Sequence, residues 1–178
     1  VGPSGLTAED YEALDARARE RGVGIVAAGN FSITAALAKH FAGIAARYVP
    51  HWEIIDYAKG AKPDAPSGTV RELAEFLGGV ADNAFEVPPE ETLGARQARG
   101  ATLGGAQVHS IRLPGYVVSF EALFGLPNER LSIRHDAGSG AEPYVGGTLL
   151  AARRATERVG LVRGLDTLLF GDASSAAS

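Results

Sequence analysis

KGAKPDAPSGT, from Lys59 to Thr69, is the stretch around which this 178-residue chain is organised. It follows an alternating, strand-like run (Trp52 to Tyr57) and precedes a helix-like run that ends near Leu77. Two lysines therefore lead into a loop of small residues that opens a helix. Backbone N–H groups at the positive end of a helix bind anions, and lysines add full charge. An ordinary strand-to-helix turn would have a similar sequence, because Asp, Ser and Thr also cap helices.

The composition bounds the class of protein. With 46% hydrophobic and 21% charged residues, the chain resembles a soluble globular protein of one or at most two domains. The net charge of −4 gives no electrostatic reason to expect nucleic acid or an anionic membrane as partner. No apolar run approaches the roughly 20 residues that span a bilayer. Without cysteine there is no disulfide, thiolate nucleophile or zinc–thiolate site, which fits the cytoplasm.

The beginning of the chain predicts half of a Rossmann-type unit. Residues 1–5 read as the end of a buried strand and a Gly-rich turn, a helix is expected over residues 8–21, and residues 23–28 form a short apolar strand. The chain contains no methionine and opens in mid-motif, so we expect a segment upstream of Val1. Asn30 and Phe31 follow the second strand, at the end where such sheets bind ligands. They could donate to and stack on a flat ring, or form only a turn and part of the core.

The second half of the chain predicts a sheet. Three alternating runs, residues 107–113, 116–124 and 130–136, have the spacing of an antiparallel meander with one apolar face. A free sheet face commonly meets another subunit. His109 and His135 lie about one strand apart, but no third ligand has useful spacing, so we expect no metal site.

The chain as a whole is predicted to be α/β, in four parts. Residues 1–30 are the remainder of a dinucleotide-binding, Rossmann-type domain. Residues 31–142 form an α+β substrate-binding and oligomerisation domain with an open mixed sheet. Residues 143–172 are a helix and a closing segment that packs back on the cofactor domain, and residues 173–178 are a small, polar, disordered tail.

The motif D-A-P-S-G-T after Lys62 resembles the signature of the dihydrodipicolinate reductase (4-hydroxy-tetrahydrodipicolinate reductase) family of lysine (diaminopimelate) biosynthesis. Other segments resemble the family in the same order along nearly the whole chain: Gly2-Pro3-Ser4-Gly5, Ala27-Ala28-Gly29-Asn30-Phe31-Ser32, Val108-His109-Ser110-Ile111-Arg112, Glu121-Ala122-Leu123-Phe124-Gly125, Leu131-Ser132-Ile133-Arg134-His135-Asp136 and Gly164-Leu165-Asp166.

The resemblance implies an oxidoreductase that uses NADH or NADPH to reduce a cyclic, imine-type dicarboxylate, and a homotetramer. It implies that Lys62 donates a proton and that Gly68 and Thr69 bind a substrate carboxylate. It implies a cofactor site made of seven residues: Gly2, Pro3, Ser4, Ala28, Gly29, Asn30 and Phe31.

Two departures from the family pattern bear on activity. The family reads H-H-x-x-K before the motif, whereas this chain reads Ala58-Lys59-Gly60-Ala61-Lys62. The acid/base histidine thus falls on Ala58, which carries no proton, and its substrate-binding neighbour on Lys59, which could bind the same carboxylate with a full charge. The family's G-x-x-G-x-x-G turn would lie upstream of Val1, so this chain alone should bind the dinucleotide weakly or not at all.

Two other functions remain open. A related NAD(P)H-dependent reductase could use Ala58 and Lys59 for another imine or an enone. Alternatively, a module that lost activity with its histidine could bind carboxylates or support assembly without catalysis.

Overall fold

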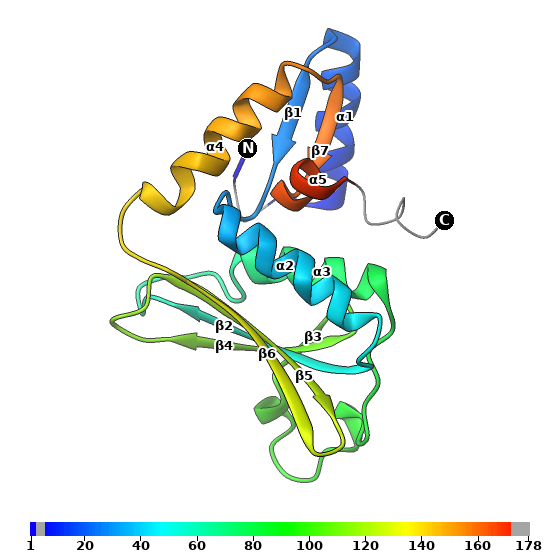
Figure 1. The fold of residues 1–178 in the computed structure, drawn as a ribbon. Coiled ribbons are helices and arrows are strands. Elements are labelled where there is room, and N and C mark those ends of the chain that lie inside the picture. The colour runs from blue at the N-terminus through cyan, green and yellow to red at the C-terminus, as the bar shows by residue number, and fades with distance from the viewer. Residues whose placement is uncertain (3–5, 172–178) are drawn as a thin grey trace. The chain divides into compact units, whose positions relative to one another are not determined.

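The computed structural model describes residues 1–2 and 6–171, and these form two compact units (Figure 1). One unit comprises residues Val1–Leu37 together with the chain from Gly140 onward, and the other comprises Ala38–Ser139. The predicted tail, residues 173–178, lies outside the described residues, as do Pro3 and Ser4. The α/β class and the open mixed sheet predicted from the sequence are confirmed.

The first unit contains a two-stranded parallel sheet between helices. Strand β1 (Gly24–Ala27) pairs in parallel with β7 (Gly160–Arg163). Val1 lies beside β1, because its amine donates to Val26 O (2.7 Å) and Ala28 N donates to Val1 O (3.1 Å). Strand β7 was missed by the sequence analysis, which treated residues 160–170 only as a closing segment.

The helices of this unit are α1 (Ala8–Arg21), α4 (Glu142–Ala155) and α5 (Leu165–Phe170). A capping box begins α1: Thr7 Oγ1 accepts from Asp10 N, and the Asp10 carboxylate accepts from Thr7 N (2.8 Å). Gly22, in the left-handed conformation, follows the helix. The core between these helices and β1 consists of small and aliphatic side chains: Val26, Ala28, Ala36, Ala151, Leu165 and Leu168.

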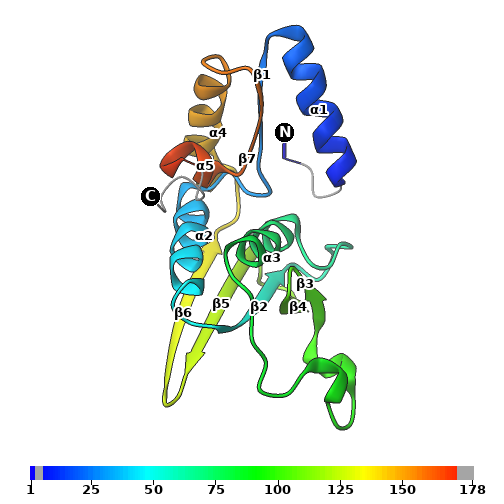
Figure 2. The same ribbon diagram turned by 90° about the vertical axis from the view of Figure 1, so that its right-hand side faces the viewer.

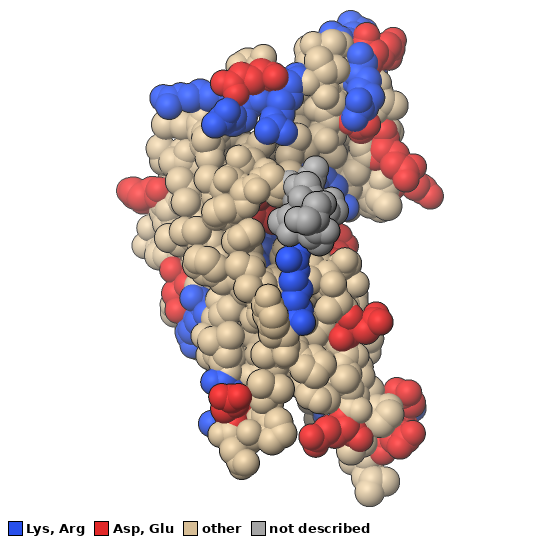
Figure 3. Space-filling view, turned by 45° about the vertical axis from the view of Figure 1, so that its right-hand side comes forward, with Lys and Arg blue, Asp and Glu red and all other residues tan. Residues whose placement is uncertain are grey.

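Charges on the surface helices are paired locally. Arg17 lies against Glu20, and Arg154 lies 3.0 Å from Glu157. On the face drawn in Figure 3, basic groups stand beside acidic ones, with broad uncharged areas between them. Exposed pairs of this kind add little to stability, about 0–1 kcal/mol each.

The second unit contains a five-stranded sheet of order β3-β4-β2-β5-β6. Its strands are β2 (His51–Ala58), β3 (Ala101–Leu103), β4 (Ala106–Arg112), β5 (Val118–Leu126) and β6 (Glu129–Ala137). The short helical turns η1 (Pro89–Glu91) and η2 (Arg96–Arg99) precede β3. Helix α2 (Ile33–Ala46) begins in the first unit and ends in the second.

The predicted meander of three consecutive strands is wrong. Strands β5 and β6 form an antiparallel hairpin, but β2 inserts between β4 and β5, in parallel with β4 and antiparallel to β5. The alternation gives the two faces of each strand but carries no information about which strand pairs with which. As a result, β2 becomes a central strand whose carboxyl end lies beside the end of β4.

Helix α3 (Gly68–Val80) packs on β2, β3 and β4, with α2 beside it (Figure 2). Its apolar residues Val70, Leu73 and Leu77 are almost fully buried, as the helical spacing predicted. On the sheet, the same side carries Ile54, Phe120 and Phe124, each at most 1% exposed. The loop between β2 and α3 thus runs from a buried central strand to a well-anchored helix.

Candidate active site

The loop from Lys59 to Ser67 begins with a turn in which Lys62 N donates to Lys59 O (3.0 Å). The side chain of Lys59 is exposed, whereas that of Lys62 is about four-fifths buried, and Lys62 Nζ lies 2.7 Å from Asp64 Oδ1. An ammonium carries three N–H donors, so Lys62 can contact a ligand while it keeps Asp64.

Ser67 is the N-cap of α3. Its backbone is extended, and its Oγ accepts from Val70 N at 3.4 Å. Among the Asp, Ser and Thr residues of the motif, Ser67 is the one that caps the helix. Gly68 and Thr69 are then the first two residues of the helix, where backbone N–H groups have no carbonyl partner within the helix. Lys62 and this helix end therefore belong to one nine-residue loop that suits an anion.

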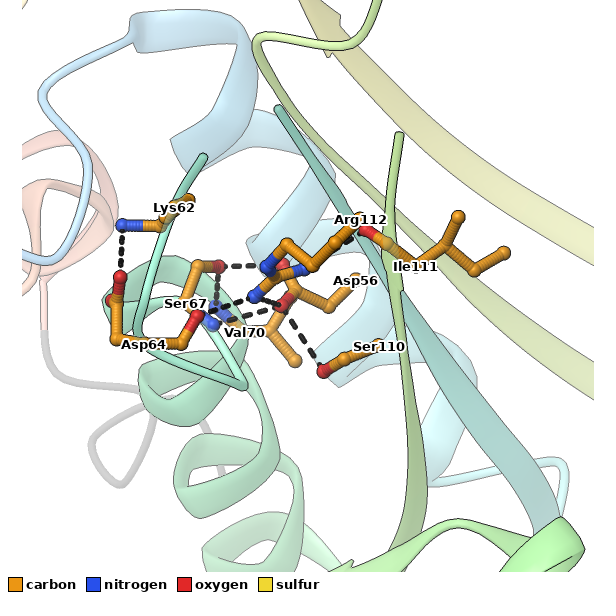
Figure 4. A network of polar contacts seen from close by, with 8 residues as sticks. All are labelled: Asp56, Lys62, Asp64, Ser67, Val70, Ser110, Ile111 and Arg112. Atoms are coloured by element: carbon orange, nitrogen blue, oxygen red, sulfur yellow. Dashed lines mark hydrogen bonds and ion pairs between the residues drawn. The ribbon is translucent and has the colours of Figure 1, made fainter. Parts of the chain in front are cut away.

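A buried carboxylate lies beneath the loop (Figure 4). Asp56 of β2 is fully buried, and it accepts hydrogen bonds from Ser67 Oγ (2.7 Å), Ser67 N (2.8 Å) and Arg112 Nη2 (2.7 Å). Ser110 Oγ adds a longer bond of 3.3 Å. The sequence analysis did not single out Asp56 or Arg112. The alternation of β2 could have identified Asp56, because it places Asp56 on the buried side of the strand with Trp52 and Ile54. An unpaired acid there would be very costly, so a buried partner was to be expected.

Ala58 is the last residue of β2 and is fully buried, beside Arg112 of β4 and Val118 of β5. Its neighbour Tyr57 does not replace a histidine at this position, because it faces the other side of the sheet. The Tyr57 hydroxyl donates to Glu121 there (3.1 Å). Burial, and then the hydrogen bond to Glu121, raises the pKa of Tyr57, so this phenol holds its proton at neutral pH.

The predicted cofactor residues come together within the first unit, as far as they are described. Gly2 lies against Phe31 and Ala28: a Cβ on Gly2 would be 3.2 Å from the Phe31 ring and 3.8 Å from Ala28 O. Asn30 Oδ1 accepts from Ser32 N (2.8 Å), and the Phe31 side chain packs on the core. Gly29 joins β1 to this turn. The two segments are therefore in close contact, and a side chain at Gly2 would have to displace the Phe31 ring slightly.

A cavity of about 530 Å³ lies elsewhere, at the amino end of β2. It is lined by His51, Trp52 and Glu53 and by residues at the end of β5 and in the segment around Phe85. The loop with Lys62 follows the opposite end of the same strand. We favour the loop as the site, because it brings together a cation, a helix N-terminus and a buried polar network, whereas the cavity is mostly apolar.

Two further observations concern metal ligands and membrane-spanning helices. Among residues 1–2 and 6–171, no group of three His, Cys, Asp or Glu side chains could hold a metal ion. Within the same residues, no helix is long and apolar enough to cross a membrane.

The fold and the site define a class: an α/β protein with a two-stranded parallel sheet in one unit and a five-stranded mixed sheet in the other, whose central strand leads into a lysine-bearing loop at a helix N-terminus. The comparisons narrow this class to one family. Residues 31–169 match the family described as "Dihydrodipicolinate reductase, C-terminus", and the chain belongs to that family.

Relatives with curated names agree with this assignment. A 4-hydroxy-tetrahydrodipicolinate reductase of Streptococcus suis is 40% identical over 169 residues, which cover 95% of this chain and 66% of that protein. One of Moorella thermoacetica is 42% identical over 169 residues, covering 95% of this chain and 62% of that protein. These relatives are oxidoreductases. The chain spans a little under two thirds of the length of each of them.

A solved structure is also similar. It is the dipicolinate-bound dihydrodipicolinate reductase from Paenisporosarcina sp. TG-14, with a TM-score of 0.74 and 33% identity, covering 93% of this chain and 62% of that chain.

Proposed function

We propose that the protein to which this chain belongs reduces 4-hydroxy-tetrahydrodipicolinate with NADH or NADPH, in the diaminopimelate route to lysine. The observation that carries the proposal is the loop itself: Lys62 and the N-terminus of α3 present a cation and helix N–H groups within nine residues. The neighbouring solved reductase was determined with dipicolinate, a planar dicarboxylate of the size that such a loop suits.

In this proposal Gly68 and Thr69 bind one substrate carboxylate with their backbone N–H groups, and Lys59 adds a charge at the exposed start of the loop. Lys62 is the proton donor. Its ion pair with Asp64 orients the ammonium until a substrate nitrogen accepts a proton. The fully buried Ala58 can take no part in proton transfer, which leaves this step to Lys62 alone.

Hydride chemistry comes from a nicotinamide cofactor when one is bound. The close contact between Gly2 and Phe31, which a larger residue at Gly2 would crowd, fits a flat ring held near Ala28, Gly29, Asn30 and Phe31. Pro3 and Ser4 complete the proposed cofactor set. We propose that residues 1–30 and 143–172 serve this cofactor domain and residues 31–142 the substrate domain. The presence of Val1–Leu37 and the chain from Gly140 in one unit supports this division.

We further propose that the protein works in the cytoplasm as a homotetramer, and that the uncovered face of the five-stranded sheet contributes to assembly. That face carries Glu121, Arg134 and Asp136, of which the last two are exposed. Light scattering of the full-length protein tests the oligomeric state, and a monomeric mass at working concentration would contradict the proposal.

The test of function is a steady-state assay of the full-length protein with each nicotinamide. Lys62→Ala should lower kcat by about 100-fold or more, because a general acid contributes 10²–10⁴-fold. Lys59→Ala is the matched control: it should raise KM and largely preserve kcat, because Lys59 contributes only binding. Equal effects of the two variants on kcat would contradict the assignment of Lys62 as the sole proton donor.

One observation favours a second candidate, a reductase of a different imine or of an enone. Ala58 is fully buried where the family keeps its histidine. If the wild-type protein does not reduce 4-hydroxy-tetrahydrodipicolinate with either cofactor but oxidises NAD(P)H with another cyclic imine, this candidate replaces the first. Dicarboxylate binding without any turnover would instead indicate a non-catalytic module.

A further inference from the structure

One carboxylate connects both ends of the loop that carries the proposed site. Asp56 is 0% exposed, and its two oxygens accept from both the hydroxyl and the backbone N–H of Ser67. Because Ser67 caps α3, these bonds fix the position of the helix N-terminus relative to β2. A buried carboxylate is tolerated only when donors surround it, so this contact cannot be released without a large cost.

The same carboxylate acts on the other end of the loop through Arg112. Arg112 Nη2 donates to Asp56 Oδ2 (2.7 Å) and also to the backbone carbonyl of Asp64 (2.7 Å). The Asp64 side chain then holds Lys62 Nζ at 2.7 Å. Figure 4 shows these contacts as one continuous set that runs from Asp56 to Lys62. The Arg112 side chain is 16% exposed, so water competes little with its bonds.

We propose that Asp56 is a positioning residue, which fixes the Lys62 ammonium and the N-terminus of α3 relative to one another before a dicarboxylate binds. The inference rests on the proposed function, in which those two groups bind the substrate. A flexible loop would present the two groups at variable distances. Binding would then have to order the loop, and the free-energy cost of that ordering would weaken the affinity for the ligand. Asp56 removes that cost before the ligand arrives, although it touches no ligand itself.

The test compares two variants of the full-length protein. Asp56→Asn keeps the size of the side chain but removes its charge and leaves an N–H₂ group facing donors. Ile54→Val is the matched control, because Ile54 is also 0% exposed and lies on the same side of β2, two residues before Asp56. Both substitutions lower stability, and only Asp56→Asn releases the loop.

The first measurement is amide hydrogen exchange of the peptide that covers residues 62–70. Asp56→Asn should speed this exchange by about tenfold or more, while Ile54→Val leaves it within twofold of wild type. The second measurement is the affinity for dipicolinate with NADH or NADPH present, by calorimetry. It should weaken by about tenfold in Asp56→Asn and change less than twofold in Ile54→Val.

If Asp56→Asn lowers the thermal midpoint but exchange and affinity both match those of Ile54→Val, Asp56 only stabilises the fold and the inference is overturned. Should Asp56→Asn not fold, Arg112→Lys decides, because lysine keeps the charge but ends one bond short of Nη2, the atom that donates to both Asp56 and the Asp64 carbonyl. Unchanged exchange of residues 62–70 in that variant would equally refute the inference. A wild-type protein that binds dipicolinate without reducing the proposed substrate would refute the function alone, and the exchange measurement would still decide the role of Asp56.

Discussion

Replacing Ser67 with alanine should lower the stability of the second unit much more than replacing a surface serine with alanine does. The substitution removes the N-cap of α3, which costs about 1 kcal/mol. It also takes a hydroxyl donor, 2.7 Å away, from the fully buried Asp56, and a hydrogen bond to a charged group contributes about 1.5–3 kcal/mol. Ser67 is 2% exposed, so water cannot easily replace the lost donor. We expect a total loss of about 2–4 kcal/mol.

Ser110→Ala is the matched control. Ser110 donates to the same carboxylate, but at 3.3 Å, from an exposed position and without capping a helix. Its replacement should cost about 0.5 kcal/mol, the lower end for a hydrogen bond. The difference in unfolding free energy between the two variants then measures the combined contribution of the helix cap and the short buried hydrogen bond.

Urea unfolding of the full-length protein measures this difference. Trp52 is buried on β2 and is the single tryptophan of this chain, so its fluorescence reports on the unit that contains Ser67. With a urea slope of about 2 kcal/mol per M, the Ser67→Ala midpoint should fall by about 1–2 M. If the free energy of unfolding falls by less than about 0.5 kcal/mol, or by the same amount as in Ser110→Ala, the reasoning that Ser67 stabilises the buried carboxylate is refuted.

Two other predictions concern packing and pH. Gly78→Ala should cost at least about 2 kcal/mol, because its Cβ would lie 2.3 Å from Gly104 O, whereas Gly79→Ala, with open space around it, should raise the urea midpoint slightly. Burial lowers the pKa of His135, which stacks on Phe120, and the charge of Asp136 only partly opposes this. Below the unfolded pKa of about 6.5 the unfolded chain therefore binds the proton more readily, and stability should fall as pH decreases from about 6.5 toward the lowered pKa. His135→Gln should flatten that slope in unfolding experiments between about pH 5 and 7, and an unchanged slope would contradict the assignment.

The sequence predicted the ends of individual helices and strands more accurately than it predicted which strands pair with one another. Helix α1 has the predicted ends, residues 8 and 21, because its capping box and its terminal glycine are both local signals. Strand β2 also lies within one residue of its predicted ends, Trp52 and Tyr57. The position of β2 between β4 and β5 was not predictable, because strand order depends on contacts between residues 54 to 74 positions apart.

The same distinction applies to the site. The motif at residues 64–69 indicated an anion site through local features: lysines, small residues and the start of a helix. What fixes this loop is Arg112, which is 48 residues from Asp64 and 56 from Asp56. Ser110 and Arg112 are two residues apart on β4, so they share one face of the strand, and both reach Asp56. No local pattern connects that face with β2, since the connection depends on the parallel register Asp56↔Ser110.

The central position of β2 gives the site its physical basis. An acid on an edge strand would be solvated and would restrain a loop weakly. Because β2 has neighbours on both sides and α3 above it, Asp56 is removed from water, and each bond it accepts is correspondingly strong. The same burial encloses Ala58, two residues further on, where the family places a histidine. In the proposed function Asp56 and its partners hold the loop that binds the dicarboxylate, and Lys62 transfers the proton, so substitutions in the two should have separable effects on affinity and on turnover.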